Sequence, residues 1–221
     1  MPTLYLTGSS GALASVIRSL YLEREWSVVG FDRTNDGFQH RDFEFIETDM
    51  LDVDSVAEAF SKANKMPRAL IATVGGVKPW STVEEIVPED FDFVVRLNLH
   101  SAFYAVRAAL PLMYVAGVGS IVTIGAETGL RPEPKKAAYV AAKAGVIAFT
   151  MSVAEEGKLR GVNANVIVPT VIHTKANESW GSPEDIAKWT PPESIAEAVF
   201  FLTSEPGKAI NGAVIRMPNK M

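Results

Sequence analysis

The chain has 221 residues, of which 48% are hydrophobic, so it can bury the core of one substantial domain. Its 21 basic and 26 acidic residues give a net charge of −5, and we expect neither nucleic acid nor a membrane as a partner. The lack of cysteine excludes disulfides and thiol catalysis, and the three histidines do not have the spacing of metal ligands, so we expect no metal site. Because the sequence shows no basic-then-apolar leader and no run of about 18 apolar residues, we expect a soluble, cytoplasmic protein.

The first residues predict a strand, a glycine turn and a helix. Residues 3–7 form a short apolar run, two glycines interrupt it, and a helical pattern of apolar residues follows. Glycine lets the backbone of such a turn bend sharply and approach a pyrophosphate, whose charge is then held by free N–H groups at the helix N-terminus. An ordinary turn has the same spacing and is the alternative. The residues predicted to bind a dinucleotide here are Gly8, Ser10, Gly11, Ala12 and Leu13.

A second strand-like run, residues 27–32, ends in an acid. Asp32 lies 24 positions after Gly8, near the spacing of about 20 for an acid that binds the adenosine ribose. A carboxylate there accepts hydrogen bonds from the ribose hydroxyls and repels a 2′-phosphate, which favours NAD(H) over NADP(H). Arg33 can pair with such a phosphate, so NADP(H) is an alternative, as is a solvated loop position for Asp32.

Strand-like and helical runs alternate along the rest of the chain. Further strands are expected at 43–48, 68–74, 119–125, 162–168 and 212–217, and helices near 53–65, 90–115, 137–159 and 193–204. This alternation predicts one domain over residues 1–221, with a doubly wound (Rossmann) α/β fold whose parallel sheet has about seven strands and helices on both faces. The long irregular stretch at residues 173–192 is expected to form a lid over the substrate.

Two of the expected helices are apolar nearly all round. Residues 99–110 and 137–153 consist largely of alanine, valine, leucine, isoleucine, phenylalanine and methionine. A helix without a polar face must be covered on both sides. One side can pack on the sheet and the other on a second subunit, so we expect a homodimer or homotetramer. Coverage by loops of the same chain is the alternative.

Tyr139 and Lys143 carry the predicted proton chemistry. They are four residues apart on a helix, so their side chains share a face, and the ammonium is expected to lower the pKa of the phenol from about 10. A lysine in a helix otherwise almost free of charge needs a reason. Tyr139 is therefore a candidate proton donor, with a surface tyrosine–lysine pair as the alternative.

Taken together, these motifs resemble the short-chain dehydrogenase/reductase family over essentially the whole chain. The matching landmarks are Thr7-Gly8-x-x-Gly11, Asp32, Asp49, Gly75-Gly76, Asn98, Tyr139-x-x-x-Lys143 and residues 169–174. The resemblance implies an oxidoreductase that transfers a hydride between a nicotinamide cofactor and a small molecule.

The same resemblance implies roles for individual residues. Asp49 and Met50 would lie at the adenine, and Gly75 and Gly76 would let the backbone pass the adenosine ribose. Lys143 would hold the nicotinamide ribose, and Asn98 would support a relay of water and protons to Lys143. The residues expected at the nicotinamide are Pro169, Ile172 and Thr174, beside Tyr139.

One position departs from the family. A catalytic serine usually stands 13 residues before the tyrosine, and this chain has Ala126 there. Loss of a donor to developing oxyanion charge can cost about 10²–10³ in rate. Either the protein is not a catalyst, or its substrate does not need that donor.

The dihydropteridine reductase subgroup of the family also has alanine at this position and is similar at residues 186–191. The similarity implies reduction of a quinonoid dihydropterin with NADH, and a quinonoid di-imine is already electrophilic enough to need little oxyanion stabilisation. We expect this substrate class, with Ala126, Trp80 and Trp180 at the substrate. The alternatives are another carbonyl compound, with Thr128 or a water in place of the serine, and a non-catalytic NAD(H) sensor.

Overall fold

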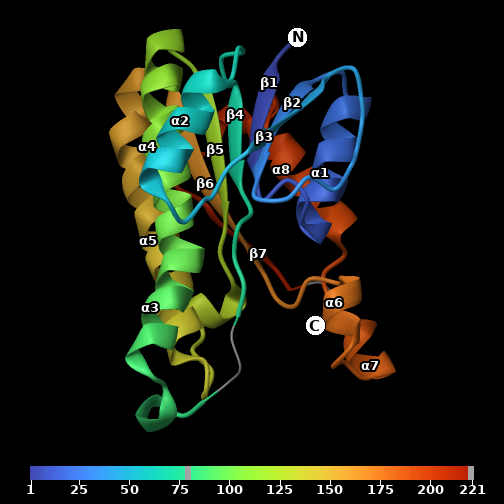
Figure 1. Ribbon diagram of the computed structural model, residues 1–221, viewed down its shortest axis with the longest axis vertical. Helices are drawn as coiled ribbons and strands as arrows, with labels where there is room; N and C mark the ends of the chain where they lie inside the picture. Colours follow the sequence, from blue (N-terminus) through green and yellow to red (C-terminus); the bar gives the residue numbers. More distant parts are fainter. Residues whose placement is uncertain (78–80, 219–221) are drawn as a thin grey trace.

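The computed structural model describes residues 1–77 and 81–218. Within these ranges seven parallel strands form one sheet in the order β3-β2-β1-β4-β5-β6-β7 (Figure 1). The strands are β1 (Thr3–Thr7), β2 (Ser27–Asp32), β3 (Phe43–Glu47), β4 (Ala69–Ala72), β5 (Gly119–Ile124), β6 (Val162–Pro169) and β7 (Val214–Met217). The predicted doubly wound parallel sheet is confirmed. β4 is shorter than expected because residues 73–76 leave the sheet and line a cleft.

Helices cover both faces of the sheet. α1 (Ala12–Glu23) packs against α8 (Pro192–Thr203) on one face, and α2 (Val53–Lys62), α4 (Ser101–Ala116) and α5 (Ala137–Gly157) cover the other (Figure 1). Side chains of β1 alternate between the two layers: Leu4 and Leu6 join the apolar cluster of α1 and α8, and Tyr5 joins that of α2 and α4. The sheet is therefore buried on both faces, as its apolar strands require.

The prediction of a single helix near 90–115 is wrong, because the chain forms three successive helical segments there. α3 (Pro88–Val95) is followed by a π-helical turn, Arg96–His100, and then by α4. Asn98 lies in this wide turn, where its Nδ2 donates to the carbonyl oxygens of Val94 at 2.9 Å and Gly76 at 2.8 Å. The turn thus ties the helical layer to the segment that follows β4.

Residues 173–192 are less irregular than predicted. They carry two short helices, α6 (Lys175–Glu178) and α7 (Pro183–Ile186), which begin at the capping side chains of Thr174 and Ser182. Trp189 in this segment is buried. The segment lies beyond the carboxyl ends of the strands (Figure 1).

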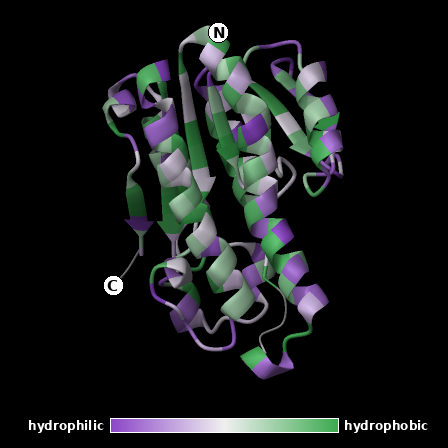
Figure 2. Ribbon diagram, turned by 90° about the vertical axis from the view of Figure 1, so that its left-hand side faces the viewer, coloured by the Kyte–Doolittle hydropathy of each residue, from purple (hydrophilic) through white to green (hydrophobic). Residues whose placement is uncertain are grey.

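Helix α5 has the length and composition of a membrane span but packs as a core helix. Within the described residues, the stretch Ala137–Arg160 is long and apolar enough to cross a membrane. It packs along β6 and also contacts α3 and the π-helical turn. Figure 2 looks onto this helical layer, where apolar and polar residues alternate along the ribbons.

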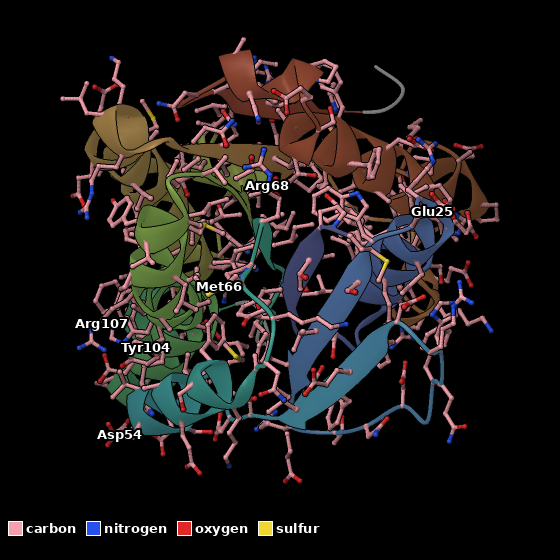
Figure 3. All side chains as sticks on the ribbon, turned by 90° about the horizontal axis from the view of Figure 1, so that it is seen from above. Glu25, Asp54, Met66, Arg68, Tyr104 and Arg107 are labelled. Carbon is pink, nitrogen blue, oxygen red and sulfur yellow. The ribbon has the colours of Figure 1, made fainter. Side chains whose placement is uncertain are left out.

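The outer side of the same layer is formed in part by α4. Tyr104 and Arg107 lie on the side of α4 that faces away from the sheet (Figure 3). Phe103 is 42% exposed, and its ring lies 6.0 Å from that of Phe149 on α5, measured between centroids. The two helices therefore present aromatic surface outward.

Candidate active site

Two cavities lie at the carboxyl ends of the strands, where β1 and β4 run side by side and the chain order reverses. Their volumes are about 350 and 400 Å³, and four residues line both of them: Leu13, Thr73, Gly75 and Thr174. We call the smaller one, which contains Gly8 and Asp32, the turn-side cavity, and the larger one, which contains Tyr139, the tyrosine-side cavity. Their shared lining makes them one continuous cleft.

The glycine turn forms one wall of the turn-side cavity. Gly8 has a φ of +66°, and a Cβ added there would lie 3.0 Å from Thr73 Oγ1 and 3.1 Å from Val74 Cγ2. Glycine is therefore required at this position both by backbone conformation and by space. Gly11, Ala12 and Leu13 also line the cavity, and the first turn of α1 leaves its N–H groups without intrahelical acceptors.

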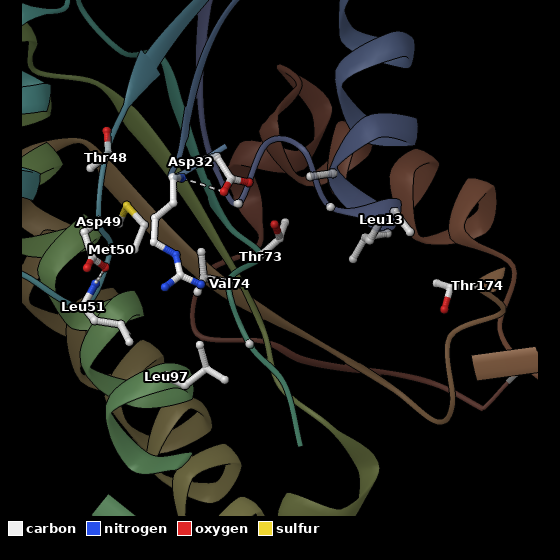
Figure 4. A pocket seen from close by; sticks show the side chains of 16 residues that line it. Leu13, Asp32, Thr48, Asp49, Met50, Leu51, Thr73, Val74, Leu97 and Thr174 are labelled. Carbon is white, nitrogen blue, oxygen red and sulfur yellow. Dashed lines mark hydrogen bonds between the residues drawn. The ribbon is translucent and has the colours of Figure 1, made fainter. Parts of the chain in front are cut away.

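Asp32 lies at the end of β2 in the same cavity (Figure 4). Its Oδ2 accepts a 3.0 Å hydrogen bond from the Ser10 N–H, and its Oδ1 accepts one of 2.7 Å from the Arg33 N–H. Ser10 itself is not among the residues that line the cleft, so it acts by orienting Asp32 rather than as a wall. Arg33 does line the turn-side cavity, next to the carboxylate.

Residues after β3 and β4 complete the turn-side cavity. Asp49 and Met50 line it as expected, with Asp49 Oδ1 accepting a 2.9 Å hydrogen bond from the Leu51 N–H. Other lining residues were not predicted: Thr48, Leu51, Val74 and Leu97 (Figure 4). The signal for the first two was present, because Thr48 to Leu51 directly follow a strand of a parallel sheet.

The middle of the cleft is kept open by Gly75. A Cβ added to Gly75 would lie 2.7 Å from Asn98 Oδ1 and 3.2 Å from Lys143 Nζ. An elongated cleft with an anion-binding turn, an acid at the end of β2 and a glycine at its waist fits an extended dinucleotide.

Lys143 and Tyr139 lie together in the tyrosine-side cavity. Lys143 is 5% exposed, and its Nζ donates a 2.8 Å hydrogen bond to the carbonyl oxygen of Ile124 at the end of β5. The same nitrogen lies 5.7 Å from the centroid of the Tyr139 ring. The predicted shared face of α5 is thus present, and it opens into the cleft.

The expected lowering of the tyrosine pKa is wrong for this structure. Burial raises the pKa of the Tyr139 phenol to about 12, and burial lowers the pKa of the Lys143 ammonium to about 8. Desolvation disfavours the charged form of each group, and it is the cause of both shifts. At neutral pH the structure therefore holds a protonated phenol beside a lysine that is still charged.

Asn98 is buried, and its side chain forms hydrogen bonds with the backbone of Gly76 and Val94. Beyond the two carbonyl contacts of its Nδ2, its Oδ1 accepts a 3.1 Å hydrogen bond from the Gly76 N–H. The side chain therefore fixes the strand-to-cleft segment on which Gly75 and Gly76 lie. Its expected part in a proton relay to Lys143 stays a prediction.

Both apolar and polar side chains line the tyrosine-side cavity around Ala126. Ala126 and Trp180 line the tyrosine-side cavity, and their role at the substrate stays a prediction, while Trp80 lies outside the described residues. Thr128 is 9% exposed and lines the same cavity, and its Oγ1 has no hydrogen-bond partner among the described residues. Lining residues that were not predicted include Glu127, Glu133, Lys136 and Asn177.

The opposite wall comes from the end of β6 and the segment after it. Pro169, Ile172 and Thr174 line the tyrosine-side cavity, and their role at the nicotinamide stays a prediction. Thr174 also caps α6 through a hydrogen bond from the Asn177 N–H. Trp180 is 54% exposed, and its ring lies 4.9 Å from that of the buried Trp189. Within residues 173–192, Trp180 therefore lines the cavity and packs against the buried Trp189.

Comparison with known proteins agrees with this geometry. The family model for short chain dehydrogenase matches residues 3–185. The chain belongs to the short chain dehydrogenase family. Members of this family are oxidoreductases that bind NAD(H) or NADP(H), so the chain is an enzyme of this class with a nicotinamide cofactor.

Relatives of known name span the whole chain. The chain is 30% identical to a 3-oxoacyl-(acyl-carrier-protein) reductase, FabG, of Rickettsia conorii, covering 99% of this chain and 96% of the relative. It is 28% identical to an acetoacetyl-CoA reductase of a Synechocystis strain, over 97% and 93% of the two chains. A crystal structure of a short chain dehydrogenase/reductase family oxidoreductase from Burkholderia thailandensis superposes with a TM-score of 0.88 and 26% identity, covering 97% of this chain and 90% of that one.

Proposed function

We propose that the protein is an NADH-dependent reductase of a small electrophilic substrate, in which Tyr139 donates the proton. The observation that carries the proposal is that Tyr139 and Lys143 line the same continuous cleft as Gly8 and Asp32. A sensor of NAD(H) needs only the part of the cleft that contains Gly8 and Asp32. The retained tyrosine and lysine favour an enzyme over a sensor.

The cofactor preference follows from Asp32. Its carboxylate is held by two backbone N–H groups in the turn-side cavity, where it would accept hydrogen bonds from the adenosine ribose and repel a 2′-phosphate. The adenine would lie along Asp49 and Met50, and the pyrophosphate at the N-terminus of α1. We therefore propose NAD(H) rather than NADP(H).

The proton chemistry is assigned to the lysine–tyrosine pair. NADH bound in the cleft would supply the hydride. The Tyr139 phenol is protonated at neutral pH because burial raises its pKa, and it is therefore in the state needed to give a proton to the reduced substrate. The Lys143 ammonium would favour the phenolate that this transfer produces, and its remaining N–H groups would bind the nicotinamide ribose.

Ala126 favours an electron-poor heterocycle as substrate. Its methyl group lines the cavity where the family usually has a serine hydroxyl, so this residue offers no hydrogen bond to a carbonyl oxygen. A quinonoid dihydropterin regains a stable ring on accepting hydride and needs little help from such a donor. We propose this class first.

Thr128 favours the second candidate class, a 3-oxo compound. Thr128 lines the same cavity and its buried Oγ1 has no hydrogen-bond partner among the described residues, so rotation of this side chain would offer a hydroxyl to a substrate carbonyl. Relatives named for 3-oxoacyl and acetoacetyl substrates support this class. In both classes Trp180 and residues 173–192 would close over the substrate as a lid.

A substrate and cofactor panel tests the proposal. NADH and NADPH are titrated by fluorescence, and NADH should bind at least about tenfold more tightly. Oxidation of NADH is then followed with quinonoid dihydropterin and with acetoacetyl-CoA. Turnover of either supports a reductase and selects the substrate class. Tight NADH binding without turnover of these or of a wider carbonyl panel would overturn the proposal in favour of the sensor.

A further inference from the structure

A buried arginine outside the cleft joins the glycine turn to the loop after β2. Arg18 lies on the inner side of α1 and is 4% exposed. A guanidinium is costly to bury unless it is paired and hydrogen-bonded, so its partners show what the burial achieves. Neither hydride nor proton transfer uses this residue.

The main partner of Arg18 is Asp36, in the loop after β2. The guanidinium donates to both carboxylate oxygens, NH2 to Oδ2 at 2.8 Å and NH1 to Oδ1 at 3.2 Å. This bidentate geometry fixes orientation as well as distance. The guanidinium carbon also lies 3.9 Å from the centroid of the Phe38 ring. Arg18 thus holds the far end of the loop from two sides.

A weaker contact links the same guanidinium to the glycine turn. Arg18 NH1 lies 3.4 Å from the carbonyl oxygen of Ser9, a residue that is fully buried between Gly8 and Ser10. The near end of the loop is joined to the turn as well, because Ser10 Oγ donates a 2.6 Å hydrogen bond to the Thr34 carbonyl. The turn is therefore joined directly to the start of the loop at Thr34 and, through Arg18, to its far end at Asp36.

The loop held in this way follows Asp32, the last residue of β2, and begins with Arg33. Asp32 and Arg33 both line the turn-side cavity, and they have opposite preferences for a 2′-phosphate. Asp32 is the last residue of β2, and the Ser10 N–H of the turn orients its carboxylate, so the direction of this side chain depends on where the turn lies. A shift of the turn relative to the loop would break the hydrogen bond from Ser10, turn the carboxylate away from the ribose and leave the Arg33 guanidinium free to approach a phosphate.

We propose that the Arg18–Asp36 pair is a clamp that sets cofactor selectivity by fixing the glycine turn, which orients Asp32, against the loop that begins with Arg33. Both residues are positioning residues and do not contact the cofactor. The inference rests on the proposed function in that it assumes that Asp32 reads the ribose. Its specific content is that selectivity depends on residues outside the cofactor cavity.

The test compares both cofactors in Asp36→Asn and in the parent enzyme. Asp36 lies in a loop with its side chain 29% exposed, so the variant should fold even if Arg18→Met does not. We expect the ratio of kcat/KM for NADH to kcat/KM for NADPH to fall about tenfold, mainly through a higher KM for NADH, with kcat nearly unchanged. Asp36→Glu keeps the charge and should restore most of the ratio.

A matched control is the exposed pair Arg24–Glu197, which joins the C-cap of α1 to α8 at 3.2 Å. Glu197→Gln should leave the cofactor ratio unchanged. A merely structural clamp would lower the melting temperature or the active fraction, and the loss would be equal with NADH and NADPH. An Asp36→Asn ratio equal to that of the parent would overturn the inference. A parent that prefers NADPH would instead overturn the proposed cofactor, and the clamp would still be judged by whether Asp36→Asn shifts that parent's ratio.

Discussion

Lys143 Nζ donates a 2.8 Å hydrogen bond to the carbonyl oxygen of Ile124, the last residue of β5. This neutral acceptor fixes the ammonium at the waist of the cleft without neutralising its charge. Burial therefore lowers the pKa of Lys143 to about 8. A charge held at a functional site at the expense of stability is a common arrangement in enzymes.

The first prediction concerns stability and pH. The pKa of Lys143 is about 8 when folded and 10.5 in its ordinary state, so between these values the unfolded chain binds more protons at this residue. The contribution of Lys143 to the free energy of unfolding should therefore be least favourable below pH 8 and should rise from pH 8 to 10.5. Lys143→Met should accordingly be more stable than the parent at pH 7, and this advantage should shrink by a few kcal/mol toward pH 10.5, at about 1.4 kcal/mol per pKa unit.

Denaturant unfolding at several pH values measures this difference. Lys62→Met is the control, because Lys62 is 62% exposed and pairs with Glu58 on the surface of α2. Its effect on stability should be small and should not follow the same pH window. A difference between Lys143→Met and parent that is constant from pH 7 to pH 10 would contradict the assigned cause.

The second prediction concerns proton transfer. Tyr139→Phe removes the phenol that acts in the transition state, so kcat should fall by about 10²–10⁴ while NADH affinity stays nearly the same. Lys143→Ala should impair both, because its ammonium is assigned to the ribose and to the phenolate. Tyr104→Phe on the outer side of α4 is the control and should leave kcat unchanged. A Tyr139→Phe enzyme as fast as the parent would show that another group supplies the proton.

The sequence predicts the positions of the site better than their electrostatics. Gly8, Asp32 and Tyr139 line the cleft. The sequence predicts their positions because Gly8 follows a strand, Asp32 ends one and Tyr139 shares a helical face with Lys143. The raised pKa of Tyr139 was not found because desolvation depends on how closely other segments pack around the phenol. Sequence spacing contains no information about that packing.

Two other features were missed for similar reasons. The π-helical turn at Arg96–His100 coincides with bonds between Asn98 and Gly76, which are 22 residues apart in sequence. The Arg18–Asp36 pair joins residues 18 apart, and an arginine within an amphipathic helix reads as a solvated residue. Long-range polar contacts of this kind have no local signature.

The third prediction separates the two substrate classes. Ala126→Ser adds the hydroxyl that the family usually has, and it should change the rate little with quinonoid dihydropterin but raise it up to about 10²-fold with a 3-oxo substrate. Thr128→Val keeps the shape of the side chain and removes its unpartnered Oγ1. If Thr128 is the donor for a carbonyl, this variant should lose at least about tenfold in kcat/KM with acetoacetyl-CoA and little with dihydropterin.

Steady-state kinetics of both variants with both substrates give the answer. Thr82→Val, which removes a hydroxyl that lines neither cavity, serves as the control for loss of a threonine. Equal effects of Thr128→Val on the two substrates would indicate a structural role for its hydroxyl. Such a result would remove the observation that favours a 3-oxo compound.

The last prediction concerns assembly. The outer faces of α4 and α5 carry Phe103, 42% exposed, and Met151, 46% exposed, and the small residue Ala148 of α5 is also exposed. Apolar surface on two adjacent helices is suited to pack against the same surface of a second copy around a twofold axis, and we expect a dimer or tetramer. Ala148→Glu would place a charge in that contact and should produce smaller species in light scattering at micromolar concentration. Phe201→Glu, on the opposite face at α8, is the matched control and should leave this contact intact. A parent protein that is already monomeric, or an Ala148→Glu protein of unchanged size, would show that the outer faces of α4 and α5 are not the interface.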